Sequence, residues 1–198
     1  MLEWIEPGAR NKKFWREFGE ALARQHKVKW NHFGWKEDNY MGALPQSNQP
    51  NADWISFYIS ERLEPQIKLS IDNGLLDQSH YEQFEKLFHS LKNIFSDEKP
   101  CLVHGDLWSG NFICDKNSQP VLIDPAVYFG HRMVDIGMTK LFGGFDEEFY
   151  EAYHHQYPIV GEEEEQISVC QLYPLLVHLN LFGRSYLPDI LNILDHLT

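Results

Sequence analysis

The sequence has few basic residues and no long hydrophobic run. Its 198 residues include 17 lysines and arginines against 29 aspartates and glutamates, for a formal net charge of −12. Such a surface repels nucleic-acid phosphates and anionic lipid headgroups, so binding to either is not expected. No apolar run approaches the roughly 20 residues that a membrane-spanning helix needs. The first residues lack the basic start and apolar core of a signal peptide, so we expect a cytoplasmic protein.

Cysteine is also scarce. The three cysteines, Cys101, Cys114 and Cys170, are odd in number, lie in apolar contexts and form no C-x-x-C pair. This pattern argues against a disulfide framework and against a zinc site, and predicts buried free thiols. Hydrophobic residues make up 43% of the chain and aromatic residues 14%. That composition is typical of a globular protein, and the length allows a sizeable core.

Apolar residues recur at three- and four-residue steps through most of the chain, which is typical of amphipathic helices. The first such segment begins after Asn11, a residue type favoured at a helix N-cap. Pro65 lies in the middle of the second and is expected to kink or split it. Glu162–Glu165 is predicted to form a helical first turn, where the macrodipole favours negative charge. Helices are predicted over residues 11–25, 52–74, 76–96 and three stretches between 130 and 198.

Two segments lack this helical spacing. Residues 1–6 are interpreted as the end of a strand that Pro7 and Gly8 break. Residues 29–51 are rich in Asn, Gly, Pro and Trp, show neither period, and predict a long ordered loop. The predicted fold is therefore mainly α with one small β-hairpin. It divides into a hinge-like strand at 1–8 and a helical body at 9–198, which contains a catalytic loop and hairpin at 101–125.

The segment Cys101–Pro125, CLVHGDLWSGNFICDKNSQPVLIDP, differs from the helices around it. The apolar runs NFIC and PVLID flank the polar turn DKNSQ, which predicts a hairpin. With Asn117 and Ser118 at its tip, residues whose numbers sum to 235 face each other. Asn111 and Asp124 satisfy that sum and are expected side by side. Amide and carboxylate oxygens are ligands that Mg²⁺ accepts together with substrate phosphates.

Asp106 and Asn111 form the pattern D-x-x-x-x-N, which is also the spacing in the catalytic loop of protein kinases. In that loop the aspartate accepts the proton of the attacking hydroxyl, the asparagine holds a metal, and a later aspartate, here Asp124, holds the metal ions. The alternative is that these residues only cap turns and a helix start. We expect His104 to brace the loop backbone rather than exchange protons. Asp135 is expected to receive backbone N–H bonds from the loop.

Several motifs together resemble the fructosamine kinase (ketosamine kinase) family, within the larger group of aminoglycoside- and choline-kinase-like phosphotransferases. They are LVHGDLWSGN, VLIDPAVYFGHRMVD, LFGGF, DNYMGALPQSN with the helix DWISFYISERLEPQ, and YPLLVHLNLFGRSYL. Trp108 in DLWSGN favours this family over the choline and aminoglycoside kinases. The resemblance implies a protein-kinase-like fold with two lobes. It also implies transfer of the ATP γ-phosphoryl group to a sugar hydroxyl of a fructosamine or ribulosamine, which is a step in protein deglycation.

The same resemblance implies roles for individual residues. Asp106 becomes the catalytic base, and Asn111 and Asp124 the ligands of Mg²⁺. The segment LEWIE resembles the hinge whose backbone groups bond adenine, so Glu3, Trp4 and Ile5 are candidate nucleotide-binding residues.

The substrate side is less well marked. Trp108, Asp38 and Asn39 are candidate contacts to the sugar–amine substrate, since an aromatic face suits a sugar ring or a cationic amine. The alternative for Asn39 and Tyr40 is that they fix their loop onto the helical body.

The sequence departs from the family pattern in two places. Met133 stands where the family usually has an acidic residue. The hinge-like segment also begins at residue 2, so the glycine-rich turn, the phosphate lysine and its glutamate partner of the N-lobe are not in these residues. We therefore expect the C-lobe of the kinase-like fold without its N-lobe. The alternatives to an active ketosamine kinase are an incompetent C-lobe remnant or a related small-molecule kinase. An uncovered hinge surface near Trp4 also predicts a homodimer.

Overall fold

The computed structural model describes residues 3–198, and Met1 and Leu2 lie outside the described part. Helix α1 (Lys12–His26) begins where the Asn11 side chain accepts the Phe14 N–H at 3.0 Å, as the N-cap prediction requires. Its inner face carries Phe14, Phe18 and Leu22, all essentially unexposed. The first predicted helix is therefore confirmed.

The segment after α1 is not the plain loop that the sequence predicts. It contains a short hairpin, β1 (Asn39–Met41) with β2 (Leu44–Gln46), in which Asn39 pairs with Gln46. Gly42 in the connecting turn has φ +58°, a conformation that glycine adopts without strain. Strands of three residues are too short to display an alternating pattern, which is why the sequence did not reveal them.

Pro65 divides the second predicted helix as expected. The segment runs as α2 (Trp54–Tyr58), a π-helical turn η1 (Ile59–Leu63) and α3 (Glu64–Asp72), with Pro65 in the first turn of α3. Proline has no N–H to donate, and the first turn of a helix does not need one. Helix α4 (Gln78–Ile94) follows, capped by the Asp77 side chain.

The predicted hairpin is present, with a register that differs by one from the prediction. In β4 (Phe112–Cys114) and β5 (Pro120–Leu122), Phe112 pairs with Leu122, so facing residue numbers sum to 234. The sequence pattern predicts a two-residue tip at Asn117 and Ser118. Instead, Asp115 N–H bonds the Gln119 carbonyl at 2.9 Å across a three-residue tip, with Ser118 at φ +60°.

One strand pairing was not predicted, and one strand prediction needs correction. The apolar run at β3 (Cys101–Val103) pairs with β6 (Tyr128–Gly130), a pairing the sequence did not indicate. Residues 3–6 form no strand, and Pro7 makes only one isolated bridge, to Asp115. Trp4 is 86% exposed, so the hinge-like surface is open, and a homodimer through it stays a prediction.

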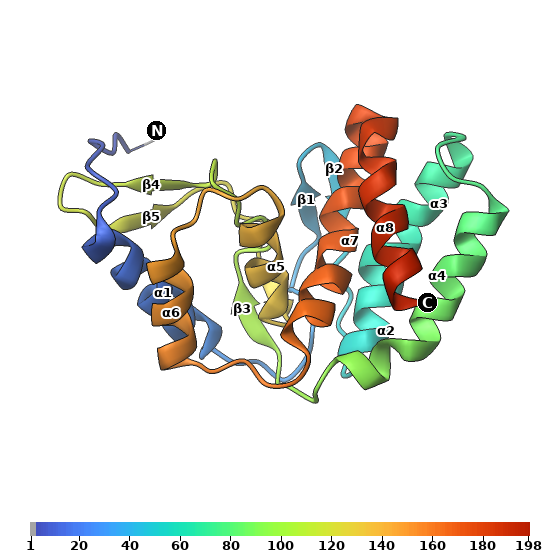
Figure 1. The fold of residues 1–198 in the computed structure, drawn as a ribbon, viewed down its shortest axis with the longest axis horizontal. Helices are drawn as coiled ribbons and strands as arrows, with labels where there is room; N and C mark the ends of the chain where they lie inside the picture. Colours follow the sequence, from blue (N-terminus) through green and yellow to red (C-terminus); the bar gives the residue numbers. More distant parts are fainter. Residues whose placement is uncertain (1–2) are drawn as a thin grey trace.

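The rest of the chain is mainly helical. Its helical elements are α5 (Met133–Leu141), α6 (Glu147–Gln156), α7 (Glu163–Phe182), the 3₁₀ turn η2 (Arg184–Tyr186) and α8 (Leu187–Leu197). Figure 1 shows α1 beside α6 at one end and α7 among α3, α5 and α8 towards the other, with β3 between the two groups. Three glutamates form the first turn of α7, as predicted.

The described residues form a mainly helical α+β fold with three two-stranded sheets. Cys101, Cys114 and Cys170 are buried free thiols, as their apolar contexts predicted. Among the helices of residues 3–198, none combines the length and the apolar character needed to span a bilayer.

Candidate active site

The loop between β3 and β4 brings Asp106 and Asn111 together. Asn111 Nδ2 donates to the Asp106 backbone oxygen at 2.8 Å and to Asp106 Oδ2 at 2.9 Å. Two tight turns close the loop, because Trp108 N–H bonds the Asp106 carbonyl and Asn111 N–H bonds the Trp108 carbonyl. With its amide nitrogen engaged in this way, Asn111 has its carbonyl oxygen Oδ1 left to accept another contact.

Partial burial raises the pKa of Asp106 above its ordinary value, while electrostatic interactions with His104 and His178 and the Asn111 hydrogen bond oppose that rise. A carboxylate in this setting holds a proton more readily than one in water, and its free oxygen remains available to a ligand.

Asp135 holds the start of the loop through its backbone N–H groups. Its Oδ2 accepts the His104 N–H at 2.8 Å and its Oδ1 accepts the Gly105 N–H at 2.9 Å. His26 Nε2 lies 3.0 Å from Oδ2, and Tyr153 Oη lies 2.8 Å from the other ring nitrogen of His26. Burial opposes ionisation of Asp135, but these hydrogen bonds and the electrostatic interactions with His26 and His104 outweigh it, so its pKa is lowered. The loop is thereby anchored on a buried carboxylate in α5.

His104 connects the loop to the strand that precedes Asp124. Its Nε2 lies 3.0 Å from the Ile123 carbonyl oxygen, and its Nδ1 lies 3.3 Å from the Asp106 backbone nitrogen. Nε2 must carry the proton to bond a carbonyl, which leaves Nδ1 to accept the backbone N–H. Both ring nitrogens are therefore engaged with backbone groups.

Asp124 follows β5 with an exposed side chain and an unusual backbone. Its φ is +49°, the left-handed region that non-glycine residues seldom occupy. Ile123 N–H bonds the Asn111 carbonyl at 3.1 Å, so the two predicted metal ligands leave the base of the hairpin close in space although they are not paired with each other. Within residues 3–198 no hydrogen bond to the Asp124 carboxylate is found, which leaves it free to accept a ligand.

The donor set fits magnesium bound together with phosphates. One free carboxylate and one free amide oxygen are hard ligands of the kind that Mg²⁺ takes when substrate phosphates and water complete its shell. In the described part of the chain no group of three or more His, Cys, Asp or Glu could hold a metal ion. A protein cage of the type used for structural zinc is therefore not formed by those residues.

The three predicted substrate residues differ in their surroundings. Asp38 Oδ1 accepts the Asn48 N–H at 2.8 Å, and Asn39 Nδ2 donates to the Val127 carbonyl at 2.8 Å. Both side chains are thus occupied in holding the β1–β2 hairpin, which is the alternative that the sequence left open for Asn39. Trp108 remains 39% exposed beside the loop.

The hinge-like residues form no enclosed site by themselves. Glu3 and Trp4 are exposed and Ile5 is half-buried. The backbone just after them is hydrogen-bonded to the β4–β5 hairpin, where the Gly8 N–H donates to the Cys114 carbonyl at 2.8 Å.

Met133 lies in the core at the start of α5, fully buried. The neighbouring Arg132 has its acidic partner elsewhere, in Glu98, whose oxygens lie 2.7–3.1 Å from the guanidinium nitrogens. The departure from the family pattern at Met133 therefore leaves no unpaired cation next to it.

An aromatic cluster beside the loop was not assigned from the sequence. His178 in α7 is 5.0 Å from Phe142 and from Tyr186 between ring centroids, and Trp108 is 6.4 Å from Phe142. Phe182 completes the cluster and is 64% exposed. His178 Nδ1 bonds the Pro174 carbonyl at 2.7 Å, which leaves Nε2 free. The signal for this cluster was the four-residue spacing of His178, Phe182 and Tyr186 at the end of α7 and in η2.

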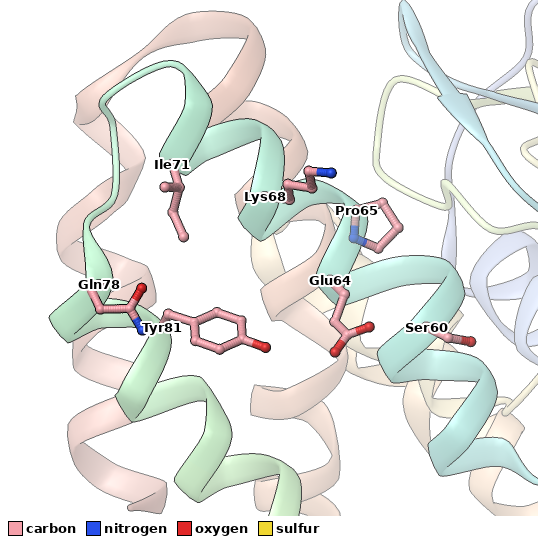
Figure 2. Close-up of a pocket in the computed structure, with 7 residues that line it drawn as sticks. All are labelled: Ser60, Glu64, Pro65, Lys68, Ile71, Gln78 and Tyr81. Carbon is pink, nitrogen blue, oxygen red and sulfur yellow. The ribbon is translucent and has the colours of Figure 1, made fainter.

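A hollow in the surface lies away from these residues. Figure 2 shows a pocket of about 630 Å³ between α3 and α4, with Glu64 and Tyr81 projecting into the same space. Its polar side chains, including Lys68 and Gln78, are exposed, and none of the predicted site residues lines it. A site for chemistry needs convergent groups shielded from water, which this pocket does not supply.

Comparisons with known proteins identify the family. The fructosamine kinase family model matches residues 1–198. A probable ketoamine kinase of Enterococcus faecium is 38% identical over 198 residues, with 99% of this chain and 70% of that protein covered. The chloroplastic protein-ribulosamine 3-kinase of Arabidopsis thaliana is 40% identical over 200 residues, and the chain spans 98% of its own length and 60% of that protein.

Solved structures agree with the sequence matches. The crystal structure of a candidate fructosamine-3-kinase of Thermobifida fusca superimposes with a TM-score of 0.92 at 33% identity, over 98% of this chain and 67% of that one. The resemblance found in the motifs is thereby confirmed, and the chain belongs to the fructosamine kinase family.

Proposed function

We propose that this chain carries the base and the metal ligands of a phosphotransferase that phosphorylates a sugar hydroxyl of a ketosamine with ATP. The observation that carries the proposal is the Asp106 carboxylate, held 2.9 Å from Asn111 Nδ2 in a loop anchored on Asp135. A base in phosphoryl transfer must be fixed within hydrogen-bond reach of the attacking hydroxyl, and this loop is fixed at both ends.

Asp106 would accept the proton of the sugar hydroxyl as its oxygen attacks the γ-phosphorus. The bond from that phosphorus to the β–γ bridging oxygen breaks, and ADP leaves with the electron pair. Burial raises the pKa of Asp106, which increases its affinity for the transferred proton. Asn111 and Asp124 would hold Mg²⁺, which offsets negative charge on the phosphates when it is bound.

The aromatic cluster supplies the acceptor side of this site. Trp108, Phe142 and Phe182 offer exposed ring surface next to the loop. Ring faces suit both the apolar face of a sugar and a protonated amine, and a ketosamine has both features. The free Nε2 of His178 can bond a sugar hydroxyl. This combination favours a sugar–amine acceptor over a purely anionic one.

The remaining roles rest on the family resemblance. Glu3, Trp4 and Ile5 are proposed to contribute to the nucleotide site. A phosphorylated ketosamine is unstable and releases the amine, so the proposed reaction amounts to protein deglycation. The named relatives, a probable ketoamine kinase and a protein-ribulosamine 3-kinase, support this substrate class.

The test measures ADP release from MgATP with a small ribulosamine and a small fructosamine, using the longest product of the gene. We expect turnover with a ketosamine, and a loss of about 10²–10⁴-fold in kcat for Asp106→Asn. Asp97→Asn is the matched control, because Asp97 is exposed in the segment after α4. Turnover of an aminoglycoside or choline, with none of a ketosamine, would replace the proposal by the related small-molecule kinase.

A separate measurement tests the remnant alternative. Isothermal titration with MgATP should give binding that Asp124→Asn weakens. No binding and no turnover by a folded protein would support an incompetent remnant and overturn the proposal.

A further inference from the structure

Arg62 is a buried cation without an ion-pair partner in residues 3–198. It lies in η1, is fully buried, and forms no contact with a carboxylate within 4.0 Å. A buried charge is costly unless hydrogen bonds compensate it. Such a residue is therefore retained against an energetic penalty, and its contacts indicate what it does.

The contacts of Arg62 join two parts of the chain. Its guanidinium donates to the Ser47 carbonyl and to Asn48 Oδ1, the latter at 2.7 Å, both just after the β1–β2 hairpin. The guanidinium plane lies over the ring of Tyr128 in β6, with 4.1 Å between the guanidinium carbon and the ring centroid. Arg62 thus ties the end of the hairpin to the first residue of β6.

The amide side chains of Asn48, Asn39 and Gln46 continue this connection towards the site. Asn48 Nδ2 lies 3.1 Å from Asn39 Oδ1, and Asn39 Nδ2 donates to the Val127 carbonyl at 2.8 Å. Gln46 Nε2 donates to Asn39 Oδ1 at 2.7 Å and to the Ala126 carbonyl at 3.2 Å. The network therefore ends on the two peptide carbonyls at residues 126 and 127, directly after Asp124-Pro125.

The segment held in this way needs external support. Asp124 has φ +49°, a left-handed conformation that residues other than glycine seldom adopt. The Ala126 carbonyl oxygen also packs against Gly105, where the Cβ of any larger residue would lie only 2.1 Å from it. Residues 124–127 therefore set the separation between the Asp124 carboxylate and the loop that carries Asp106.

We propose that Arg62 is a positioning residue for Asp124, acting through the amides of Asn39, Gln46 and Asn48. Arg62 holds two elements that contact residues 124–127. It holds the β1–β2 hairpin through Ser47 and Asn48, and it holds strand β6 through Tyr128. This inference rests on the proposed function, because it assigns Asp124 to the metal–phosphate site.

The geometry requires arginine rather than any cation. The planar guanidinium donates along two edges while its face lies on an aromatic ring, and a lysine ammonium cannot do both. Arg62→Lys keeps the positive charge but loses the planar group that donates to both Ser47 and Asn48. Asn39→Ala keeps Arg62 and cuts the network at its other end, at a half-buried position.

The experiment measures how much Mg²⁺ strengthens ADP binding, by isothermal titration with and without Mg²⁺. For Arg62→Lys and Asn39→Ala we expect the Mg²⁺-dependent gain in ADP affinity to fall at least fivefold, with Mg²⁺-free affinity within twofold of the parent. Two controls bracket this result. Gln49→Ala changes an exposed residue after the same hairpin, and Arg132→Lys changes a buried arginine that is paired with Glu98.

Three outcomes are decisive. A fivefold fall in both network variants and in neither control supports the inference. An unchanged gain in folded Asn39→Ala overturns it, even if Arg62→Lys fails to fold, and leaves the proposed function intact when the parent turns over a ketosamine. A parent protein with neither turnover nor any Mg²⁺-dependent gain overturns the proposed function and this inference with it.

Discussion

Replacement of Asp135 by asparagine tests the anchoring of the loop most directly. The carboxylate is fully buried and accepts from the His104 and Gly105 N–H groups at 2.8 and 2.9 Å and from His26 at 3.0 Å. Asparagine has nearly the same shape but only one acceptor oxygen. Its NH₂ group must then face one of the backbone N–H donors, so at least one buried donor loses its partner.

The magnitude follows from these contacts. A buried hydrogen bond to a charged group contributes about 1.5–3 kcal/mol, and removing one partner of a buried ionic pair costs about 3–5 kcal/mol. We expect Asp135→Asn to lower the free energy of unfolding by about 3–5 kcal/mol, measured by urea denaturation at pH 7. The pKa of Asp135 is lowered in the fold, so its stabilising effect is present above the unfolded value of 3.8 and is lost as the pH falls towards the folded value.

A double-mutant cycle separates the histidine from the backbone contacts. His26→Gln, Asp135→Asn and the double variant should show a coupling energy of about 0.5–3 kcal/mol, because the two side chains are in direct contact. Asp72→Asn, at an exposed position at the end of α3, should change stability by less than about 0.5 kcal/mol. A cost below about 1 kcal/mol for Asp135→Asn would contradict the reasoning, since an amide would then suffice for the anchor.

Three further variants test other parts of the structure. Burial lowers the pKa of His131 to about 4, so the fold should lose stability as the pH falls below the unfolded pKa of 6.5, by about 3 kcal/mol at pH 4. In urea titrations at pH 7, 5 and 4, His131→Phe should make the free energy of unfolding depend less on pH. Gly105→Ala forces a side chain at φ +83° against the Ala126 carbonyl and should reduce kcat at least about tenfold. Asn11→Ala should cost about 1 kcal/mol in the same urea assay, because the Phe14 N–H loses its cap.

The parts of the site that are local in sequence could be predicted. Asp106 and Asn111 lie five residues apart in one loop, and their contact depends only on the turns between them. The α1 cap and the division of the second helix at Pro65 are equally local. The register of the β4–β5 hairpin was a local error, because a tip of three residues rather than two shifted it by one position. Tip length depends on the left-handed Ser118, and serine does not signal that conformation.

The parts held by distant residues could not be predicted. His26 reaches Asp135 across 109 positions, and Asn39 reaches Val127 across 88. His26 falls on the apolar face of α1, four residues after Leu22, so a polar residue on an inner face was the available signal. Arg62 gave no such signal, because an arginine in a helix is ordinarily solvent-exposed.

The distant contacts act mainly on backbone groups, and this has a consequence for the chemistry. Asp135 bonds two peptide N–H groups, while His104, Gln46 and Asn39 bond the carbonyls of residues 123, 126 and 127. A backbone contact fixes where a residue lies without depending on its side chain. Asp106 and Asp124 are therefore positioned by contacts to the backbone beside them, and each carboxylate keeps an oxygen free for ligands. Catalysis of phosphoryl transfer depends on positioning and on charges fixed in advance. Substitution of the side chains that hold this backbone should therefore displace the Asp106 and Asp124 carboxylates without changing their charge. Such variants should weaken metal–nucleotide binding because the carboxylates are misplaced.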